Sequence, residues 1–314
     1  MKLSRYARER ALALPPAIRG MLWMALCSLC FAALNASTRT ITADLHPWQT
    51  QCLRYAFGAL VLLPLALRQG RGLFRTGQLR LHMARNLLHT AGTSLWFLAL
   101  PIVPLAEVTA IGFTSPIFLT IGALLFFGET VRLRRWLAIF FGFLGVLIVL
   151  YPNLRLGLSA SWASLLLLAS APIASLSYLI AKVLMRHDPP QTVVFWQGVL
   201  VAAFTFPLAI YFWGPMTLQH VALFLLIGAL GSMGHYALNR SLRATDISAS
   251  QPARFLELIW ASALGFLIWQ DVPPVWTFVG AMVIFSSTTY IAHREARLAR
   301  QAKEDGLRPG AKSP

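Results

Sequence analysis

From residue 104 to residue 150 the chain reads PLAEVTAIGFTSPIFLTIGALLFF, then GETVRLRRW, then LAIFFGFLGVLIVL. The two outer pieces are almost entirely apolar, and a helix of about 20 such residues crosses a bilayer. The short middle piece carries Glu129 and three arginines. This stretch therefore predicts two membrane-spanning helices joined by a charged turn.

A weaker copy of this stretch begins at Asp246. It reads DISASQPARFLELIWASALGFLIW, then QDVPPVW, then TFVGAMVIFSSTTYI. An offset of 142 residues places Glu129 on Asp271 and Ala138 on Gly280. LLPLAL at 62–67 also matches TFPLAI at 205–210, with an offset of 143. The chain thus consists of two related halves.

Composition places the chain in the membrane class. It has 314 residues, of which 57% are hydrophobic and only 12% are charged, and its mean hydropathy is +0.63. A soluble domain carries about 25% charged residues. The net charge of +16 does not indicate nucleic-acid binding, because most lysines and arginines lie in short loops and in the two tails.

The fold class predicted is an all-α integral membrane protein with ten transmembrane helices. Short links rich in proline, glycine and charge separate the apolar runs, so neighbouring helices run antiparallel. The ten predicted spans are 20–40, 46–68, 81–100, 104–127, 134–152, 160–182, 192–213, 218–240, 247–269 and 274–292.

The positive charges predict the orientation of these spans. Lysines and arginines concentrate in the termini and in every second loop, and such loops face the cytoplasm. Both termini are therefore expected in the cytoplasm, in a bacterial inner membrane. Five spans per half is an odd number, so the second half enters the membrane upside down. Inverted repeats are typical of secondary transporters, whose substrate site lies between the halves.

These features divide the chain into four parts. Residues 1–19 form a basic cytoplasmic N-terminus, residues 20–152 the first repeat, residues 160–293 the second repeat, and residues 294–314 a charged tail predicted to be disordered. The run from Met21 is long enough for a retained spanning helix rather than a cleaved signal peptide.

No cofactor or metal is expected from the motifs. Cys27 and Cys30 form a C-x-x-C pair, but it lies in an apolar run with no second pair and is interpreted as packing. GxxxxGK[ST] is absent from the sequence, so direct drive by ATP is not predicted.

The chain resembles the EamA-like branch of the drug/metabolite transporter superfamily. The resemblance covers residues 18–293 and rests on LRYAFGALVLLPLAL, on PLAEVTAIGFTSPIF with GETVRLRRW, and on ISASQPARFLELIWASALGFLIW. The family usually has Gly-Glu at the second copied turn, where this chain has Gln270 and Asp271. The resemblance implies a central cavity lined by spans 1–4 and 6–9, with spans 5 and 10 at the periphery.

Charges inside the membrane are costly and tend to mark function. Arg254 and Glu257 are three residues apart at mid-depth of the ninth span, on one helix face, just after the helix-breaking Pro252. They are interpreted either as a gated pair that holds cargo or as a permanent structural ion pair. Arg54 is a further candidate for cargo, and Glu257 and Glu107 are candidates for proton coupling.

Polar and aromatic residues on the predicted cavity helices complete the candidate substrate site, although each could equally serve helix packing. They are Asn35, His89, Trp96, Tyr178, Tyr236, Asn239 and Trp260.

The function predicted is secondary transport of a small polar or zwitterionic organic metabolite, such as an amino acid or a related compound, by alternating access. The resemblance allows export as its direction, and the chain is expected to act as a monomer or homodimer. One alternative is a broad exporter of hydrophobic cations, which would need a negative cavity. The other is a membrane enzyme acting on lipid head groups.

Overall fold

Helices form all the regular structure in the residues that the computed structural model describes, which are 14–41, 44–69, 75–99, 112, 114–129, 133–154, 162–270 and 275–306. Several begin at a proline, whose missing N–H costs nothing in the first turn. Pro16 starts the first described helix, Pro47 the second and Pro190 the helix after the loop at Asp188.

The helices follow the predicted apolar runs in order. Their bounds are α2 (Pro16–Ile41), α3 (Pro47–Gln69), α4 (Leu79–Ala99), α6 (Ser115–Phe127), α7 (Leu133–Leu154), α8 (Trp162–Leu184), α9 (Pro190–Tyr211), α10 (Leu218–Ala244), α11 (Ile247–Ser250), the 3₁₀ segment η2 (Gln251–Phe255), α12 (Leu256–Trp269) and α13 (Val275–Gly306).

The ninth predicted span is broken rather than continuous. α11 passes into η2 at Gln251, and a regular α-helix resumes only at Leu256. Pro252 stands in η2, where its missing N–H and its ring disfavour a continuous α-helix. The break places Arg254 in η2 and Glu257 in the first turn of α12.

The C-terminal tail is a correction to the sequence-based prediction. Residues from Arg294 were expected to be disordered, but α13 continues to Gly306. The added segment, REARLARQAKEDG, is rich in alanine, arginine, glutamate and lysine, which have high helix propensity. Charge alone is therefore a poor sign of disorder here. Residues 307–314 lie outside the described part of the chain.

The two copied turns share an unusual backbone conformation. Gly128 ends α6 with φ 62° and ψ 25°, and Gln270 ends α12 with φ 58° and ψ 25°. The two residues are related by the offset of 142 seen in the sequence. The left-handed conformation suits glycine and strains glutamine. The backbone has thus kept the turn although the second copy has lost its glycine.

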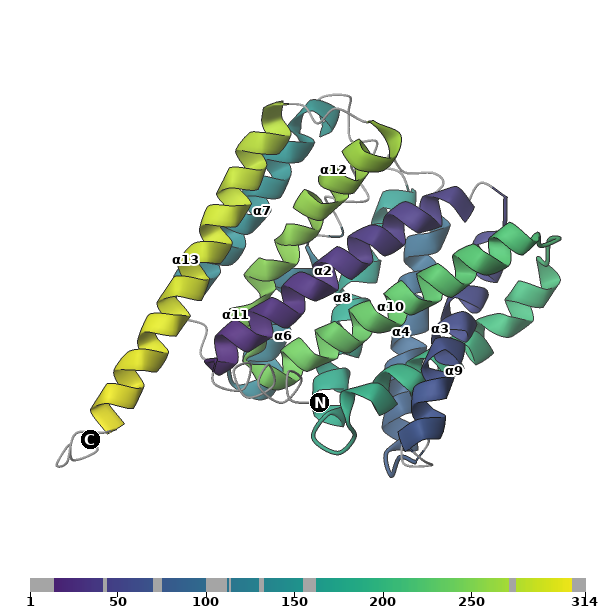
Figure 1. Cartoon of the computed structure of the whole chain (residues 1–314), viewed down its shortest axis with the longest axis horizontal. Coiled ribbons are helices and arrows are strands. Elements are labelled where there is room, and N and C mark those ends of the chain that lie inside the picture. The colour runs from purple at the N-terminus through teal and green to yellow at the C-terminus, as the bar shows by residue number, and fades with distance from the viewer. Residues whose placement is uncertain are drawn as a thin grey trace.

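Helix packing also relates the two halves. α2 packs on α10, and the corresponding helices α8 and α4 pack on each other. α3 packs on its counterpart α9, and α7 on its counterpart α13. Figure 1 shows α7 and α13 side by side at one edge of the bundle, in the peripheral place that the resemblance implied for spans 5 and 10.

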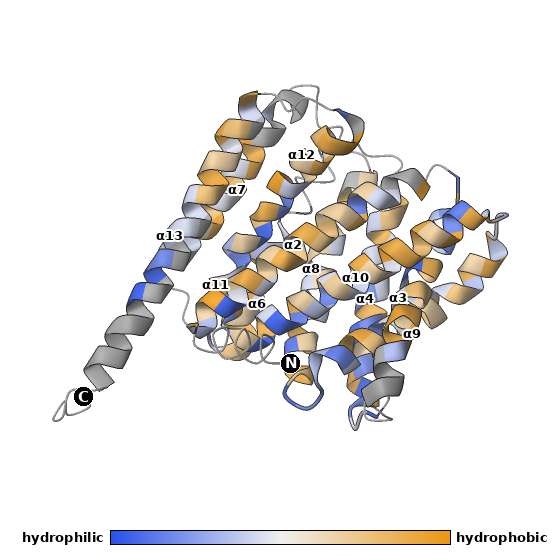
Figure 2. Cartoon of the chain, in the orientation of Figure 1, coloured by the Kyte–Doolittle hydropathy of each residue, from blue (hydrophilic) through white to orange (hydrophobic). Residues whose placement is uncertain are grey.

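The outer surface of the bundle is apolar. Leu125, Phe126, Leu165 and Met282 are each at least 66% exposed, and Figure 2 shows α13 changing from hydrophobic to hydrophilic towards its C-terminal end. Large exposed apolar surfaces mark contact with a membrane or a partner. Within the described residues, four helical stretches are long and apolar enough to cross a bilayer: Pro16–Thr38, Leu165–Leu184, Pro190–Tyr211 and Leu218–Ala244.

Candidate functional site

Gln197 interrupts the apolar helix α9 and lies at the centre of the bundle with 1% exposure. Its Oε1 accepts a hydrogen bond from Arg85 Nη2 at 3.0 Å. Its Nε2 lies 2.8 Å from His89 Nε2 and 3.2 Å from His235 Nε2. One amide therefore joins α4, α9 and α10.

Arg85 sets the direction of these hydrogen bonds. A guanidinium can only donate, so the oxygen of Gln197 faces it and the amide nitrogen faces the two histidines. Each histidine then accepts at Nε2 and, in its neutral form, carries its proton on Nδ1. The Tyr55 hydroxyl, 2.7 Å from His89 Nε2, shares that acceptor.

The Nδ1 atoms of both histidines are buried and have no hydrogen-bond partner among the described residues. The same holds for Nε of Arg54 and of Arg85. Buried polar groups are nearly always paired. A binding site whose ligand carries hydrogen-bond acceptors has unpaired donors of this kind until the ligand binds.

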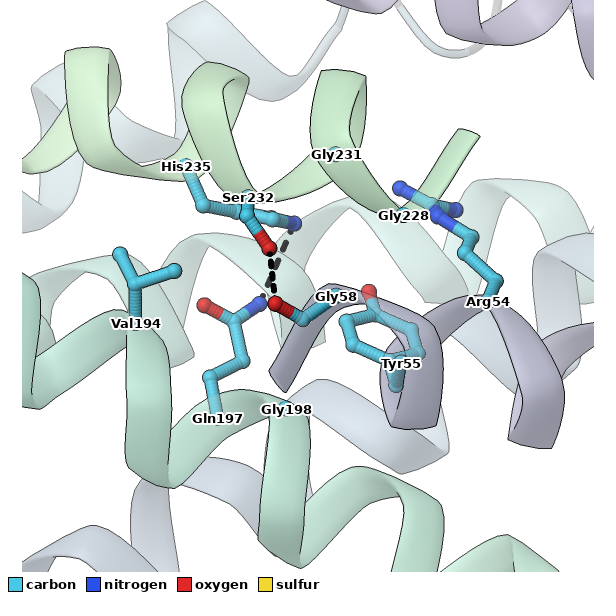
Figure 3. Close-up of a pocket in the computed structure, with 10 residues that line it drawn as sticks. All are labelled: Arg54, Tyr55, Gly58, Val194, Gln197, Gly198, Gly228, Gly231, Ser232 and His235. Atoms are coloured by element: carbon cyan, nitrogen blue, oxygen red, sulfur yellow. Dashed lines mark hydrogen bonds between the residues drawn. The ribbon is translucent and has the colours of Figure 1, made fainter. Parts of the chain in front are cut away.

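A small pocket opens beside this network, between α3, α9 and α10 (Figure 3). Its free volume of about 10 Å³ leaves room for about one water molecule. Three helices supply its lining, which consists of Arg54, Tyr55, Gly58, Val194, Gln197, Gly198, Gly228, Gly231, Ser232 and His235.

Glycines keep the pocket small. A Cβ on Gly228 would come within 2.8 Å of the backbone N of Gly58, and a Cβ on Gly198 within 2.9 Å of the Cβ of Ala59. The missing side chains let α9 and α10 approach α3 closely. Ser232 strengthens the contact by donating to the carbonyl of Gly58 at 2.9 Å. α3, α9 and α10 are therefore closely packed around the pocket.

Arg54 is half-buried at the edge of this pocket. Its guanidinium carbon lies 5.1 Å from the centre of the Tyr55 ring, a cation–π distance. None of the ion pairs between described side chains includes Arg54 or Arg85. Within the described part of the chain, the centre thus carries two guanidinium charges without a carboxylate partner.

A second polar cluster joins the predicted pair to α2. Arg254 Nε donates to Glu257 Oε2 at 3.1 Å, and Asn35 Nδ2 donates to Glu257 Oε1 at 3.2 Å. The ring of Phe31 lies between the clusters, 5.1 Å from the Arg254 guanidinium and 5.1 Å from the His235 ring. Three residues singled out in the sequence therefore meet directly in the fold.

The other candidates are distributed unevenly around these clusters. Tyr178 lies near the centre, with its ring 5.9 Å from that of His89. Trp96 packs instead against Phe97 and an apolar cluster near Ala99, and Tyr236 contacts Trp23 edge-on at 5.8 Å.

Two further candidates carry buried polar atoms that have no hydrogen-bond partner among the described residues. Asn239 is 1% exposed, with neither amide atom paired among the described residues. Trp260 of α12 likewise has an unpaired buried Nε1 there. Glu107 lies outside the described residues.

Sequence reasoning missed the residue at the centre, Gln197. A single amide in the apolar run FWQGVLV was a usable signal, because an uncharged polar residue in a spanning helix needs partners. A second signal was the polar face of α4, where His82, Arg85 and His89 recur at helical spacing and are all buried.

Comparison with known proteins supplies the family. The model of the EamA-like transporter family matches residues 18–151 and again residues 161–292. A riboflavin transporter from Rhizobium johnstonii is 33% identical over 298 residues, covering 93% of this chain and 98% of that protein. An S-adenosylmethionine uptake transporter from Rickettsia bellii is 26% identical over 278 residues, covering 88% and 94%.

A solved crystal structure shares the fold. Its TM-score is 0.73 at 18% identity, and the match covers 89% of this chain and 98% of that one. The family match, the apolar helices and the transporter relatives together indicate a multi-pass membrane protein that handles a small molecule. The two family matches account for most of the chain, which therefore belongs to the EamA-like transporter family.

Proposed function

We propose that this chain is a secondary transporter of a small polar metabolite with a flat heteroaromatic ring, and that the cargo binds at the cluster around Gln197. The observation that carries the proposal is the set of buried, unpaired donors at His89, His235 and Arg54, next to the Tyr55 ring. A ring system edged with carbonyl oxygens and ring nitrogens satisfies such donors. Its face can stack on aromatic side chains.

Riboflavin is the first cargo to test. It combines a flat, acceptor-rich ring system with a chain of hydroxyl groups, and a riboflavin transporter is 33% identical to this chain. Ligand sites of this kind are mostly apolar with a few placed polar groups. The pocket lining supplies such polar groups at Gln197, His235 and Arg54, beside four glycines.

A zwitterionic cargo is the second candidate, favoured by Arg254 and Glu257. Their opposite charges, 3.1 Å apart, could separate to hold a carboxylate and an amine. S-adenosylmethionine carries both groups and an aromatic base, and a relative is named as its uptake transporter. That name makes uptake a direction to test beside the export considered from the sequence.

The alternatives have less support. A site for hydrophobic cations needs excess negative charge, whereas the described clusters hold Arg54, Arg85 and Arg254 against Glu257. An enzyme acting on lipid head groups is disfavoured because the family and the relatives compared above are transporters.

Transport by alternating access fits the closed centre. Free volume for about one water molecule cannot hold a metabolite, so the helices around the pocket must move apart, with α10 moving away from α3, before cargo enters. We propose that the halves are inverted repeats of five spans each, rocking about the contact between α3 and α9. The matched packing of α2 on α10 and α4 on α8 supports this pseudo-symmetry. Cytoplasmic termini follow from the loop charges.

The test is flux into liposomes that contain the purified protein. Saturable uptake of labelled riboflavin is expected, with S-adenosylmethionine and an amino-acid panel assayed in parallel. Arg54→Gln removes a charged donor and should raise KM by about tenfold or more. Arg243→Gln, an exposed arginine at the end of α10, is the matched control and should leave KM unchanged. No saturable flux of any of these compounds would refute the proposal.

A further inference from the structure

One end of the bundle is closed by contacts between the two halves of the chain. Asp44, in the loop between α2 and α3, accepts a hydrogen bond on Oδ2 from His220 Nε2 of α10 at 3.1 Å. Gln49 pairs with the backbone of Gly214 through both amide atoms, at 3.0 and 2.9 Å. The rings of His46 and Phe212 stack 4.1 Å apart. Figure 1 shows the end of α2 beside the start of α10 at this point.

A second Asp–His pair is the reverse of the first, because its aspartate comes from the second half of the chain and its histidine from the first half. Asp188, in the loop between α8 and α9, accepts on Oδ2 from His82 Nε2 of α4 at 2.8 Å. The Thr76 hydroxyl donates to the same oxygen at 2.6 Å and accepts from the backbone N of Gln78 at 2.9 Å. Asp188 therefore ties the loop before α9 to the start of α4.

These two pairs lie at opposite ends of the bundle. Asp44 stands before the first residue of α3, and Thr76 follows the last. α3 has 23 residues, which at about 1.5 Å per residue separates its ends by roughly 34 Å. Each end thus has one aspartate from one half and one histidine from the other.

The two pairs also occupy equivalent places in the repeat. Each aspartate lies in the loop before the second helix of its own half, close to a starting proline, Pro47 or Pro190. Each histidine lies in the first turn of the third helix of the opposite half, at His220 of α10 or His82 of α4. The equivalence follows the pairing of α2 with α10 and of α8 with α4.

We propose that the Asp44–His220 and Asp188–His82 pairs are the latches of two gates, one at each end of the transport path. Both pairs are formed in this structure and the pocket beside Gln197 is small, so the described residues have the arrangement expected of an occluded state. Each pair bridges the halves that separate when its own end opens, and the other pair holds the far end closed. This inference rests on the proposed transport function.

The two Asp–His pairs differ in how far their side chains are buried. The side chains of His82 and Asp188 are 0% and 8% exposed, whereas those of His220 and Asp44 are 11% and 60% exposed. Ion pairs in contact with water contribute little, and breaking a buried pair is far more costly. The Asp44–His220 end therefore opens more readily, and the empty protein presents its site at that end more often.

The experiment measures access to the pocket from each side without any cargo. Ser232, which lines the pocket, is changed to cysteine in a chain whose three native cysteines are replaced by alanine. A membrane-impermeant thiol reagent is then applied to right-side-out and to inside-out vesicles. Asp44→Asn should raise the labelling rate about fivefold from one side only. Asp188→Asn should raise it about tenfold or more, from the opposite side only.

Neighbouring residues supply the controls. Gln219→Ala is exposed beside His220, and His187→Ala is exposed beside Asp188; neither should change labelling. Exchanging the partners, as Asp44→His with His220→Asp, should restore the original rate and excludes a mere folding defect. Unchanged labelling in both aspartate variants, a response from the same side in both, a response in only one, or failure of the exchange would overturn the proposal. Since no cargo is used, these outcomes are independent of the flux assay.

Discussion

Arg85 Nη2 donates to Gln197 Oε1 at 3.0 Å, and this one contact orders the polar centre of the protein. It turns the amide nitrogen of Gln197 towards His89 and His235. Both imidazoles are thereby held with buried Nδ1 atoms that have no partner among the described residues, and these are the groups we propose for cargo. In the proposed cargo site, Arg85 would therefore act through Gln197, as a positioning residue.

Gln197→Leu removes the centre of this network. Arg85 loses an acceptor in a fully buried position, and unmade buried hydrogen bonds cost about 1–3 kcal/mol. We expect a lower melting temperature in detergent and a transport rate reduced by tenfold or more. The control is Gln191→Leu in the same helix, whose Oε1 has no partner among the described residues. Equal effects of the two variants would refute a special role for Gln197.

Glu257→Gln tests proton coupling. The carboxylate accepts from Arg254 and Asn35, and a coupling proton would have to displace these contacts. We expect the variant to transport with a rate independent of pH, measured as counterflow between pH 5.5 and 8. Glu129→Gln, at the turn after α6, should keep the pH dependence of the native protein. An unchanged pH profile in Glu257→Gln would rule out its coupling role.

Glu129 should stabilise the fold above about pH 4.5. Burial would raise its pKa, but hydrogen bonds from Lys182 and from the backbone of Ile247 and Ser248 outweigh burial and hold the pKa below its ordinary value of 4.5. A carboxyl whose pKa is lower in the folded chain contributes stability that is present above the unfolded value and lost as pH falls through the folded one.

The measurement is the melting temperature from pH 7 down to pH 3. Glu129→Gln should lower the free energy of unfolding by roughly 1–3 kcal/mol at pH 7. Below pH 4.5, its melting temperature should fall less steeply than that of the native protein. Lys182→Gln should reduce this acid-induced fall in melting temperature only in part, because the backbone N–H groups of Ile247 and Ser248 still donate to Glu129. A native protein whose melting temperature does not fall in this range contradicts the assignment.

Gln270→Gly should stabilise the second copied turn. Gln270 has φ 58°, where a side chain costs about 1–2 kcal/mol and glycine costs none. Glycine loses more backbone entropy on folding, so the net gain expected is roughly 0.5–1 kcal/mol. The reciprocal variant, Gly128→Gln, should lower the melting temperature of the protein. The melting temperature should therefore rise in Gln270→Gly and fall in Gly128→Gln. A change in the same direction in both variants would contradict this explanation.

Much of the helical framework could be predicted from the sequence. The apolar runs and the proline-bounded loops predicted helices where α2 to α13 are described, and the offset of 142 predicted their repetition. Pro252 predicted the break between α11 and α12. These signals are local, because hydropathy and proline act on the residues around them. The prediction of a disordered tail was wrong as far as Gly306 for the same local reason, since helix propensity outweighed charge.

The charged turn around Glu129 shows where local reasoning ends. Its sequence determined a turn between two apolar helices, and its copy at Gln270 keeps the same backbone angles. Only the tertiary structure decided that Glu129 binds the start of α11, 118 residues away along the chain. The Gln197 network and the two Asp–His pairs were decided in the same way. Each depends on which helix faces which, and that is set by close packing between distant segments rather than by the sequence around each residue.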